Sequence, residues 1–537
     1  MKKIISLLLA FVLVLSFTGC AKTSDKGNGN TESKTTDNQK QGSENEKTEP
    51  KFDTAGLALP ISKDKVEIEY MISEHANNPV KEDWTVFQEL EKVTNIKLKL
   101  QPVGADYSQK LNLMVSSGQL PELFTSTVDF GKMYGVEGAL IPISDYLKKM
   151  PNYSKFLAEN PQTKKDLAAS DGKIYNAVHY GHEVFGQGWL YRMDILKKHN
   201  LSVPKTYDEF YEVCKKLKEI YPDSYPFSHR KKNGIAAEIG VQWGTGYGVY
   251  YNLDTKRFQY GCIEDNFRDM LMFLKRLYDE NLMDREWATI SAKQWEDRMT
   301  NEQSFITYDY LARIKVFNPA MAEKNPEYDL EAALPPKAPN GKALIKTTYD
   351  KNGTAMEGFM VSKNNKHPEE TFKLLDFLYS RYGQIITNLG VEGATYKKDA
   401  NGNLVWVDDI KSSISPNGTK HYTNDFGFIA LGTYTVVTPE VRMLTREKGY
   451  KEAVELYENN DVATGSDPQI SMTEAELDVV KSKTSLGDYV DEQIMKFVLG
   501  ERSLSEWDAF VKEVKAKGVD ELVKVYNDAL DRYNKVN

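Results

Sequence analysis

The first folded segment alternates apolar and polar side chains. The apolar ones recur at every second position, at Val66, Ile68, Tyr70 and Ile72. This is the period of a strand with one dominantly apolar face. A helix is expected at about 84–93, and the alternation returns at 96–100. Because a strand–helix–strand order favours a parallel sheet with covering helices, the segment predicts an α/β fold.

Later helices are indicated by how they begin and end. Thr206-Tyr-Asp-Glu209 has the pattern of a capping box and is followed by apolar residues at helical spacing. Pro368 and Ser503 open two further helices, and Asp520 begins the last one. The sequence therefore predicts an α/β protein with a helical C-terminal part. The body from Asp53 onward is long enough to require more than one lobe.

The N-terminus has the parts of an export signal. Lys2 and Lys3 precede an apolar run from Ile4 to Phe17, which is shorter than the roughly 20 residues of a spanning helix. Residues 1–19 are expected to form a signal peptide. Phe17-Thr18-Gly19-Cys20 resembles a bacterial lipobox, although Leu is commoner at the position of Phe17. Cys20 is then the expected lipidation site, and the alternatives are ordinary secretion or a short membrane anchor.

The segment that follows Cys20 is almost wholly polar. Residues 21–52 contain one large apolar side chain, Phe52. Such a segment buries too little apolar surface to offset the entropy of ordering. We therefore interpret 20–52 as a lipidated cysteine and a disordered linker between the membrane and the folded body.

Charge and cysteine usage exclude several classes of protein. The formal net charge is −9, which argues against a nucleic-acid partner because nucleic acids are bound by basic surfaces. Three cysteines are too few for a disulfide scaffold. Cys214 lies on the apolar side of a predicted helix and is expected to be a core thiol. The sequence does not decide whether Cys214 and Cys262 are bridged.

No motif indicates catalysis, a cofactor or a metal. The chain has no nucleophile elbow, zinc pattern, phosphate loop or dinucleotide fingerprint, so it is not expected to be an enzyme. His179 and His182 are three residues apart but have no third ligand nearby. Carboxylate pairs such as Asp408-Asp409 arise by chance in an acidic chain, so a surface glycosidase stays a distant alternative.

Several segments, taken in order, resemble one family. They are 117–147, 171–180, 190–219, 357–396 and the C-terminal helices. In the most specific, 190–219, a strand carrying Arg and Asp leads through Pro-Lys-Thr into the capped helix. These segments resemble family 1 extracellular solute-binding lipoproteins of carbohydrate ABC transporters, the maltodextrin-binding-like group, over residues 61–535.

The resemblance implies a two-lobed periplasmic-binding-protein-like fold (type II) with crossing segments between the lobes. Lobe 1 would comprise 53–180 and 355–410, and lobe 2 would comprise 181–354 and 411–537. Some relatives carry a calcium loop after the capped helix, but 221–228 has one carboxylate, so no calcium is expected.

The function implied by the resemblance is solute capture. The protein would hold an oligosaccharide in the cleft by domain closure and deliver it to an ABC permease. It would be a monomer, lipid-anchored at the extracytoplasmic face of a Gram-positive-like cell membrane. The alternatives are a binder of oligopeptides or other non-sugar ligands, and a sugar-sensing lipoprotein.

Candidate binding residues follow from the chemistry of a sugar, which presents an apolar face and a ring of hydroxyls. Flat aromatic side chains stack on the face, and charged groups bind the hydroxyls. Trp243 and Tyr247 lie in a glycine-rich loop, and Trp189 follows the predicted crossing. For each ring the alternative is a core position.

The polar candidates come from strand ends and from the segment 307–318, which carries rings and charges to ligand in relatives. They are Glu74, His75, Asp129, Glu183, Tyr308, Asp309, Arg313 and Glu357. For Asp129 and Glu357 the alternative is helix capping. Arg192 and Asp194 are expected to pair structurally, and Trp287 and Trp295 are expected in the core.

Overall fold

The structure is a computed structural model that describes residues 53–75, 78–347, 349, 353–412, 415, 417–446 and 448–535. The predictions for the signal peptide, for Cys20 and for the linker to residue 52 lie outside the described residues.

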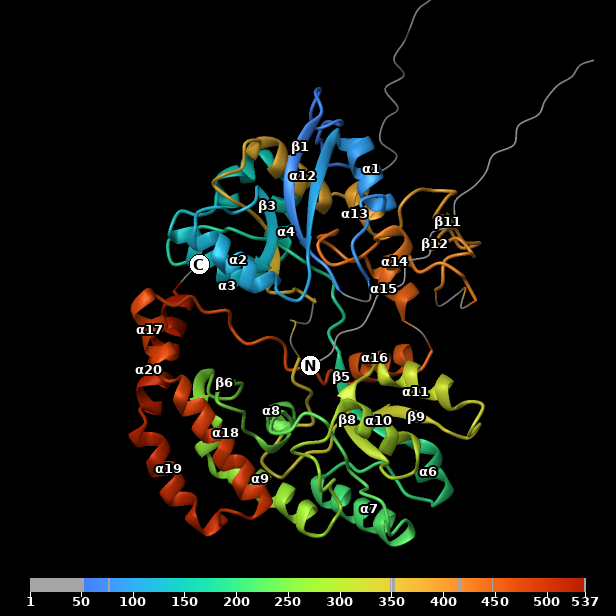
Figure 1. Cartoon of the computed structure of the whole chain (residues 1–537), viewed down its shortest axis with the longest axis vertical. Helices are drawn as coiled ribbons and strands as arrows, with labels where there is room; N and C mark the ends of the chain where they lie inside the picture. Colours follow the sequence, from blue (N-terminus) through green and yellow to red (C-terminus); the bar gives the residue numbers. More distant parts are fainter. Residues whose placement is uncertain are drawn as a thin grey trace, which may run out of the picture. The chain divides into compact units, whose positions relative to one another are not determined.

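A five-stranded sheet organises the first lobe (Figure 1). Its strand order is β2-β1-β3-β10-β4, in which β1 is parallel to β2 and β3, and β10 is antiparallel to β3 and β4. The strands are β1 (Val66–Ser73), β2 (Ile96–Val103), β3 (Leu123–Thr127), β4 (Ala177–Val178) and β10 (Glu357–Val361). A separate hairpin comprises β11 (Tyr396–Lys398) and β12 (Leu404–Trp406).

Helices bury both faces of this sheet. Ile68, Tyr70 and Ile72 belong to one apolar cluster, whereas Met71 belongs to a second cluster on the opposite face. The helices are α1 (Thr85–Thr94), α2 (Tyr107–Ser116), α3 (Val128–Val136), α4 (Pro151–Glu159), α5 (Pro161–Leu167), α12 (Pro368–Tyr379), α13 (Arg381–Asn388), α14 (Tyr422–Phe426) and α15 (Pro439–Thr445). The predicted parallel strand–helix–strand start is confirmed.

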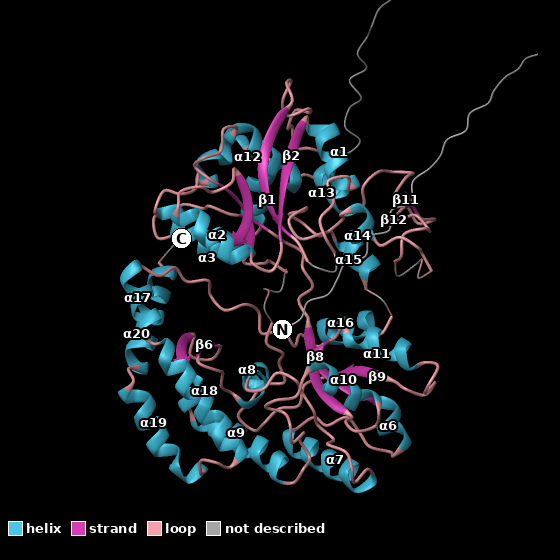
Figure 2. Cartoon of the chain, in the orientation of Figure 1, coloured by secondary structure: helices cyan, strands magenta, loops and turns pink. Residues whose placement is uncertain are grey.

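The second lobe contains a smaller antiparallel sheet of order β8-β5-β9 and a hairpin, β6-β7 (Figure 2). The strands are β5 (Gln187–Arg192), β6 (Val249–Asn252), β7 (Arg257–Tyr260), β8 (Ile306–Tyr310) and β9 (Leu330–Ala333). The helices before the C-terminal part are α6 (Met193–Lys198), α7 (Tyr207–Ile220), α8 (Gly234–Ile239), α9 (Asp265–Asp279), α10 (Ala292–Thr300) and α11 (Arg313–Met321).

The C-terminal part is helical, as predicted. It consists of α16 (Tyr450–Asn459), α17 (Glu474–Ser482), α18 (Thr484–Leu499), α19 (Trp507–Ala516) and α20 (Val519–Tyr533). Phe497, Trp507 and Phe510 pack into the main cluster of the second lobe, beside α9. Short 3₁₀ turns occupy Ile143–Lys149, Gly240–Trp243, Gly261–Ile263 and Leu504–Glu506.

The predicted helix caps are partly realised. The hydroxyl of Thr206 accepts a hydrogen bond from the Glu209 N–H at 3.2 Å, which satisfies one free donor of the first turn of α7. The Glu209 carboxylate instead accepts from the N–H of Lys205 at 2.7 Å. The helix therefore begins where the sequence predicts it, with half of the capping box.

One segment packs differently from the predicted lobe boundary at residue 410. Val441 and Leu444 of α15 join an apolar cluster with Ile385 and Trp406, and Phe428 joins the cluster under the first sheet. Their apolar side chains complete the first lobe's packing. Residues 422–445 therefore belong structurally with the first lobe rather than the second.

A buried ion pair holds the start of α6 against the second sheet. The guanidinium of Arg192 is fully buried and donates to both carboxylate oxygens of Asp194, at 2.9 and 2.6 Å. It also donates to the Met299 carbonyl at 3.3 Å and lies 3.9 Å from the Tyr328 ring centroid. The predicted structural pairing is confirmed.

We expect Arg192→Met to lower the free energy of unfolding by about 3–5 kcal/mol, because Asp194 would be left as a buried, unpaired charge. Urea denaturation followed by tryptophan fluorescence measures this loss. Lys293→Met is the matched control, since it breaks a solvent-exposed pair with Asp297 and should leave the transition in place. Equal midpoints for the two variants would contradict the assignment.

Candidate functional site

The chain crosses between the two sheets at three places. β4 leads through residues 179–186 into β5, a second stretch leads from β9 back to β10, and a third connects α15 with α16. We call the end of the first sheet where β1, β3 and β4 finish and β10 begins the first edge. The second edge is the end of the second sheet where β5 begins and β8 and β9 finish. The first two crossings run directly from one edge to the other.

Four predicted residues lie at the first edge. Glu74 and His75 follow β1, Asp129 is in the first turn of α3 directly after β3, and Glu357 opens β10 opposite Thr127. The Glu74 carboxylate accepts from the N–H of Val80 at 3.1 Å. The strand topology therefore brings three carboxylates to one end of the sheet.

Backbone hydrogen bonds attach the first crossing to the segment before α15 and to the second crossing. Tyr180 donates its N–H to the Thr435 carbonyl at 2.7 Å, and its own carbonyl accepts from Val437 at 2.8 Å. On the other side, His182 donates its N–H to the Gly353 carbonyl at 2.9 Å. A Cβ on Gly353 would lie 2.2 Å from the His182 carbonyl oxygen, and φ is +75°. Only glycine allows this close approach.

Histidine and tyrosine rings from the first two crossings, and Tyr434 from the segment before α15, meet beside Glu357. His179 stacks on Tyr434 with centroids 5.1 Å apart, and His182 lies 5.0 Å from the Tyr349 ring. The Glu357 carboxylate is 3.7 Å from Nδ1 of His179, which lowers the pKa of Glu357. Burial, with His179 nearby, lowers the pKa of His182 to about 4. His182 is therefore neutral at pH 7.

Glu183 has a structural partner. The Arg446 guanidinium donates to both oxygens of Glu183, at 2.7 and 2.9 Å, and to Glu458 on α16 at 2.9 Å. Arg446 is buried and lies directly after α15. The predicted ligand residue Glu183 therefore serves, in this structure, to tie the first crossing to the third.

A buried carboxylate organises the second edge. Asp309 accepts two hydrogen bonds from Arg230, at 2.8 and 3.0 Å, and lies 3.4 Å from Nε of Arg313. Arg313 also donates to Glu296 at 2.8 Å. The structure thus brings together the predicted Asp309 and Arg313 and adds Arg230, which the sequence analysis missed because it lies 79 residues away in the chain.

Tyr310 is the exposed ring of the second edge. It is the last residue of β8, and 47% of its surface is exposed. The Arg230 guanidinium carbon is 5.8 Å and the Lys231 ammonium nitrogen 5.0 Å from the ring centroid. Tyr308, the residue predicted from the sequence, lies two positions earlier in the same strand. The end of the strand could have indicated Tyr310 instead, since the last side chain of a strand has fewer neighbours to cover it.

Trp189 and Tyr308 are core side chains, and this corrects their prediction as ligand contacts. Each is 1% exposed, and the rings meet edge to face at 5.5 Å. The Trp189 indole N–H donates to the side-chain oxygen of Gln242 at 3.1 Å, and Phe210 lies 5.3 Å away. Protein atoms enclose both rings, so neither has a free face for a sugar.

The two loop candidates are also largely enclosed. Trp243 is 8% exposed and packs against Tyr207 and Phe273, at 4.6 and 5.3 Å between centroids. The Tyr247 hydroxyl donates to Asp491 on α18. The predicted glycine-rich loop therefore packs on the core of the second lobe, and its Trp243 ring has little exposed surface for contact with a sugar.

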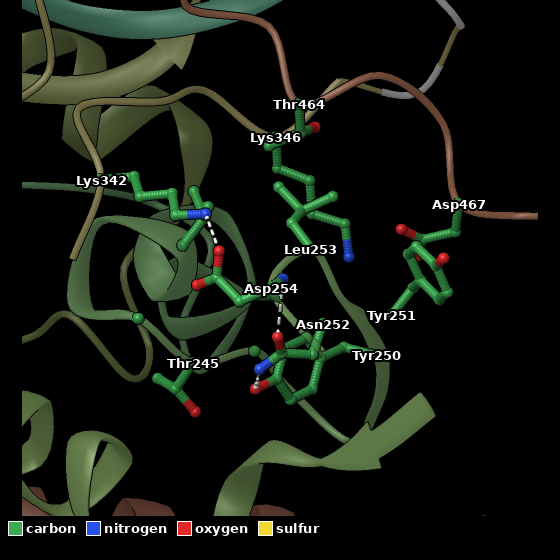
Figure 3. A pocket seen from close by; sticks show the side chains of 14 residues that line it. Thr245, Tyr250, Tyr251, Asn252, Leu253, Asp254, Lys342, Lys346, Thr464 and Asp467 are labelled. Atoms are coloured by element: carbon green, nitrogen blue, oxygen red, sulfur yellow. Dashed lines mark hydrogen bonds and ion pairs between the residues drawn. The ribbon is translucent and has the colours of Figure 1, made fainter. Parts of the chain in front are cut away.

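The same loop borders a surface hollow (Figure 3). Tyr250 donates to Glu264 at 3.0 Å and accepts from Asn252 at 3.1 Å, whereas Lys342 pairs with Asp254 at 2.5 Å. The labelled residues around the hollow are Thr245, Tyr250, Tyr251, Asn252, Leu253, Asp254, Lys342, Lys346, Thr464 and Asp467. Burial raises the pKa of Asp467, and Lys346 opposes this shift. The hollow thus offers rings and amide groups.

Both described cysteines are buried, free thiols, and burial raises the pKa of Cys262 to about 12. The expected core position of Cys214 is confirmed. Within the described ranges, no group of three metal-binding side chains comes together. No helix in this part of the chain is both long and apolar enough to cross a membrane.

Comparison with known proteins identifies the family. The model of bacterial extracellular solute-binding proteins matches residues 73–385. This chain belongs to that family. The fructooligosaccharide ABC transporter substrate-binding protein FusA of Streptococcus pneumoniae serotype 4 is 25% identical over 538 residues, which covers 92% of this chain and 95% of FusA. Lipoprotein LipO of Bacillus subtilis (strain 168) is 25% identical over 459 residues, with coverages of 82% and 87%.

A solved structure agrees with the fold. The alginate-binding protein AlgQ2, in its crystal structure without calcium ion, superimposes with a TM-score of 0.69 at 25% identity. The match covers 88% of this chain and 99% of AlgQ2. The resemblance to solute-binding proteins and the two-lobed α/β fold with a helical C-terminal part are confirmed.

We expect acid to destabilise the protein through His229, next to Arg230. Its two ring nitrogens have no hydrogen-bond partner, and burial lowers its pKa to about 3. Below about pH 6.5 the His229 imidazole is protonated in the unfolded chain but stays neutral in the native state. The free energy of unfolding therefore falls by at most about 1.4 kcal/mol per pH unit as the pH is lowered. His229→Phe should reduce this slope, since Phe227 and Trp287 surround the ring.

Unfolding midpoints between pH 7.5 and 4.5 test this expectation. His367→Gln, in the first lobe, is the control and should keep the parental slope. If His229→Phe loses stability with acid as steeply as the parent protein, the buried neutral imidazole is not the cause.

Proposed function

We propose that this protein captures an oligosaccharide between the first and second edges and delivers it to the membrane permease of an ABC importer. The observation that carries the proposal is the pairing of two sheet edges, joined by crossing segments, that present an exposed ring, guanidinium groups and carboxylates. FusA, named for fructooligosaccharides, and AlgQ2, named for alginate, support a sugar ligand.

The side chains suit the two surfaces of a sugar. The face of Tyr310 supports the apolar side of a pyranose or furanose ring. Arg230 and Arg313 hold their carboxylates through some of their N–H groups and keep others for hydroxyl oxygens. At the first edge, the carboxylates of Asp129 and Glu357 accept hydrogen bonds from hydroxyls.

We propose that the three crossings act as the hinge for domain closure. The first crossing is short and is hydrogen-bonded to the second through His182 and Gly353, and to the third through Glu183 and Arg446, so the lobes turn about these segments without disturbing either core. A ligand that touches both edges selects the closed form through its higher affinity for that form. The permease then recognises the closed form. Lobe 1 would comprise 53–180 with 355–446, and lobe 2 the remainder.

We also propose that the protein acts as a monomeric, non-catalytic lipoprotein at the extracytoplasmic face of the cell membrane. Its family is extracellular, and its relative LipO is a lipoprotein. Cys20 would carry the lipid, and residues 21–52 would give the binding lobes reach. The bound sugar would leave chemically intact.

Binding calorimetry on purified protein tests the central proposal, after a thermal-shift screen of oligosaccharides has found a ligand. We expect Tyr310→Ala to weaken binding roughly tenfold, which corresponds to about 1.4 kcal/mol, because a stacking surface is lost. Tyr278→Ala is the matched control. Tyr278 is on α9, away from both edges, and the guanidinium carbon of Arg285 lies 4.4 Å from its ring centroid. Unchanged affinity in Tyr310→Ala would remove the platform from the site.

We expect Cys20→Ser to release the protein from the membrane, because a serine offers no thiol for lipid attachment. Expression in a Gram-positive host followed by detergent-phase partitioning measures the loss. Mass spectrometry of the N-terminal peptide identifies any lipid. The control Thr23→Ser, in the linker, should partition like the parent protein. Recovery of the Cys20→Ser protein in the detergent phase would contradict lipidation at Cys20.

A further inference from the structure

The charges of the two edges are unequal. Glu74, Asp129 and Glu357 converge at the first edge. Among the described residues, none of these three carboxylates forms an ion pair with a lysine or arginine. Nδ1 of His179 lies 3.7 Å from Glu357 and lowers its pKa, and the charge of Arg442 acts on the neighbouring His182, which is neutral. The first edge is therefore an acidic surface at pH 7.

Lys132, the cation closest in sequence to Asp129, offsets that acidic surface only in part. Its ammonium group is buried and donates to the carbonyl of Gln469 at 2.7 Å. Burial lowers its pKa, although the charge of Asp129 opposes this effect. Asp129 itself is exposed, and its charge helps to raise the pKa of Tyr526 on α20. The Asp129 carboxylate thus lies close to the C-terminal helices.

The cations of the second edge are already matched. Arg230 is held by Asp309, Arg313 by Glu296 and Lys231 by Glu238. Burial raises the pKa of Glu238 to about 7, so Glu238 compensates Lys231 only in part at neutral pH. The second edge therefore carries at most a small net positive charge. The hollow near the glycine-rich loop adds Lys342 paired with Asp254, and Lys346 near Asp467.

This arrangement has opposite consequences for neutral and acidic sugars. A hydroxyl donates to a carboxylate, so a neutral oligosaccharide satisfies the acceptors of the first edge. In a uronic acid, a carboxylate takes the place of the hydroxymethyl group of the neutral sugar. A hydrogen-bond donor is lost, and a negative charge is added to the ligand. The added charge would be desolvated close to like charges, and the guanidinium groups, whose charges are already matched by Asp309 and Glu296, would offset that repulsion only in part.

We propose that the ligand is an uncharged oligosaccharide, and that Glu74, Asp129 and Glu357 exclude acidic sugars from the site. This inference rests on the proposed function and names the chemical class of its ligand. Specificity arises here from repulsion of the wrong ligand as well as attraction of the right one.

Matched pairs of oligosaccharides test the exclusion. Each pair has the same linkage and length and differs only in oxidation of the C6 hydroxymethyl groups, as in galactose and galacturonate trimers. Calorimetry at pH 7.5 and about 20 mM salt should show the neutral member binding at least tenfold more tightly than its acidic partner. The ratio should fall in high salt, because mobile ions screen the repulsion.

The variant Glu74→Gln/Asp129→Asn/Glu357→Gln isolates the cause. It keeps the shape of the first edge and removes its charge, so the preference for the neutral member should fall below about threefold. The control Asp64→Asn/Glu219→Gln/Asp488→Asn removes three exposed carboxylates elsewhere and should keep the full preference. The comparison thus separates local repulsion from overall net charge.

The outcomes are distinguishable. Equal or tighter binding of acidic members by the native protein overturns the inference and leaves the proposed function standing. A triple first-edge variant that discriminates as strongly as the native protein also overturns it. If no member of any pair binds, by calorimetry or by thermal shift, the proposed function itself fails.

Discussion

The close packing of three chain segments between the sheets determines where the functional groups lie. Tyr180 forms backbone hydrogen bonds to Thr435 and Val437 in the segment before α15. His182 forms one to Gly353 in the second crossing, where there is no room for a side chain. Because each sheet is attached to this junction by its strand ends, the carboxylates of one sheet and the guanidinium groups of the other belong to the same part of the molecule. The Glu183–Arg446 pair adds a side-chain contact to the backbone ones.

Within the second lobe, Asp309 holds two arginine side chains in place. Its buried charge is stable there because Arg230 satisfies both carboxylate oxygens and Arg313 approaches one of them. In return the carboxylate fixes the direction of two long side chains, so their rotamer entropy is lost during folding. In the proposed site, these donors would therefore already be ordered before a ligand binds.

Local patterns predicted much of the fold and part of the site. The strand from Val66, the parallel partner at 96 and the helix after Thr206 follow from spacing within a few residues. Glu74, Asp129 and Glu357 lie at strand ends, where the sequence places them, and their contact with a ligand stays a prediction. The ring platforms were missed because burial depends on distant packing, as Trp189 shows by its contacts with Phe210 and Tyr308. Arg230 and the packing of α15 depend on contacts between segments far apart in the sequence.

The position of β10 has a consequence for biosynthesis. This strand lies between β3 and β4 in the first sheet, yet it is made roughly two hundred residues after them. Until residue 361 has left the ribosome, the sheet lacks its inner member, and the edges of β3 and β4 have no partner. The first sheet therefore cannot be completed until about two thirds of the chain has been synthesised.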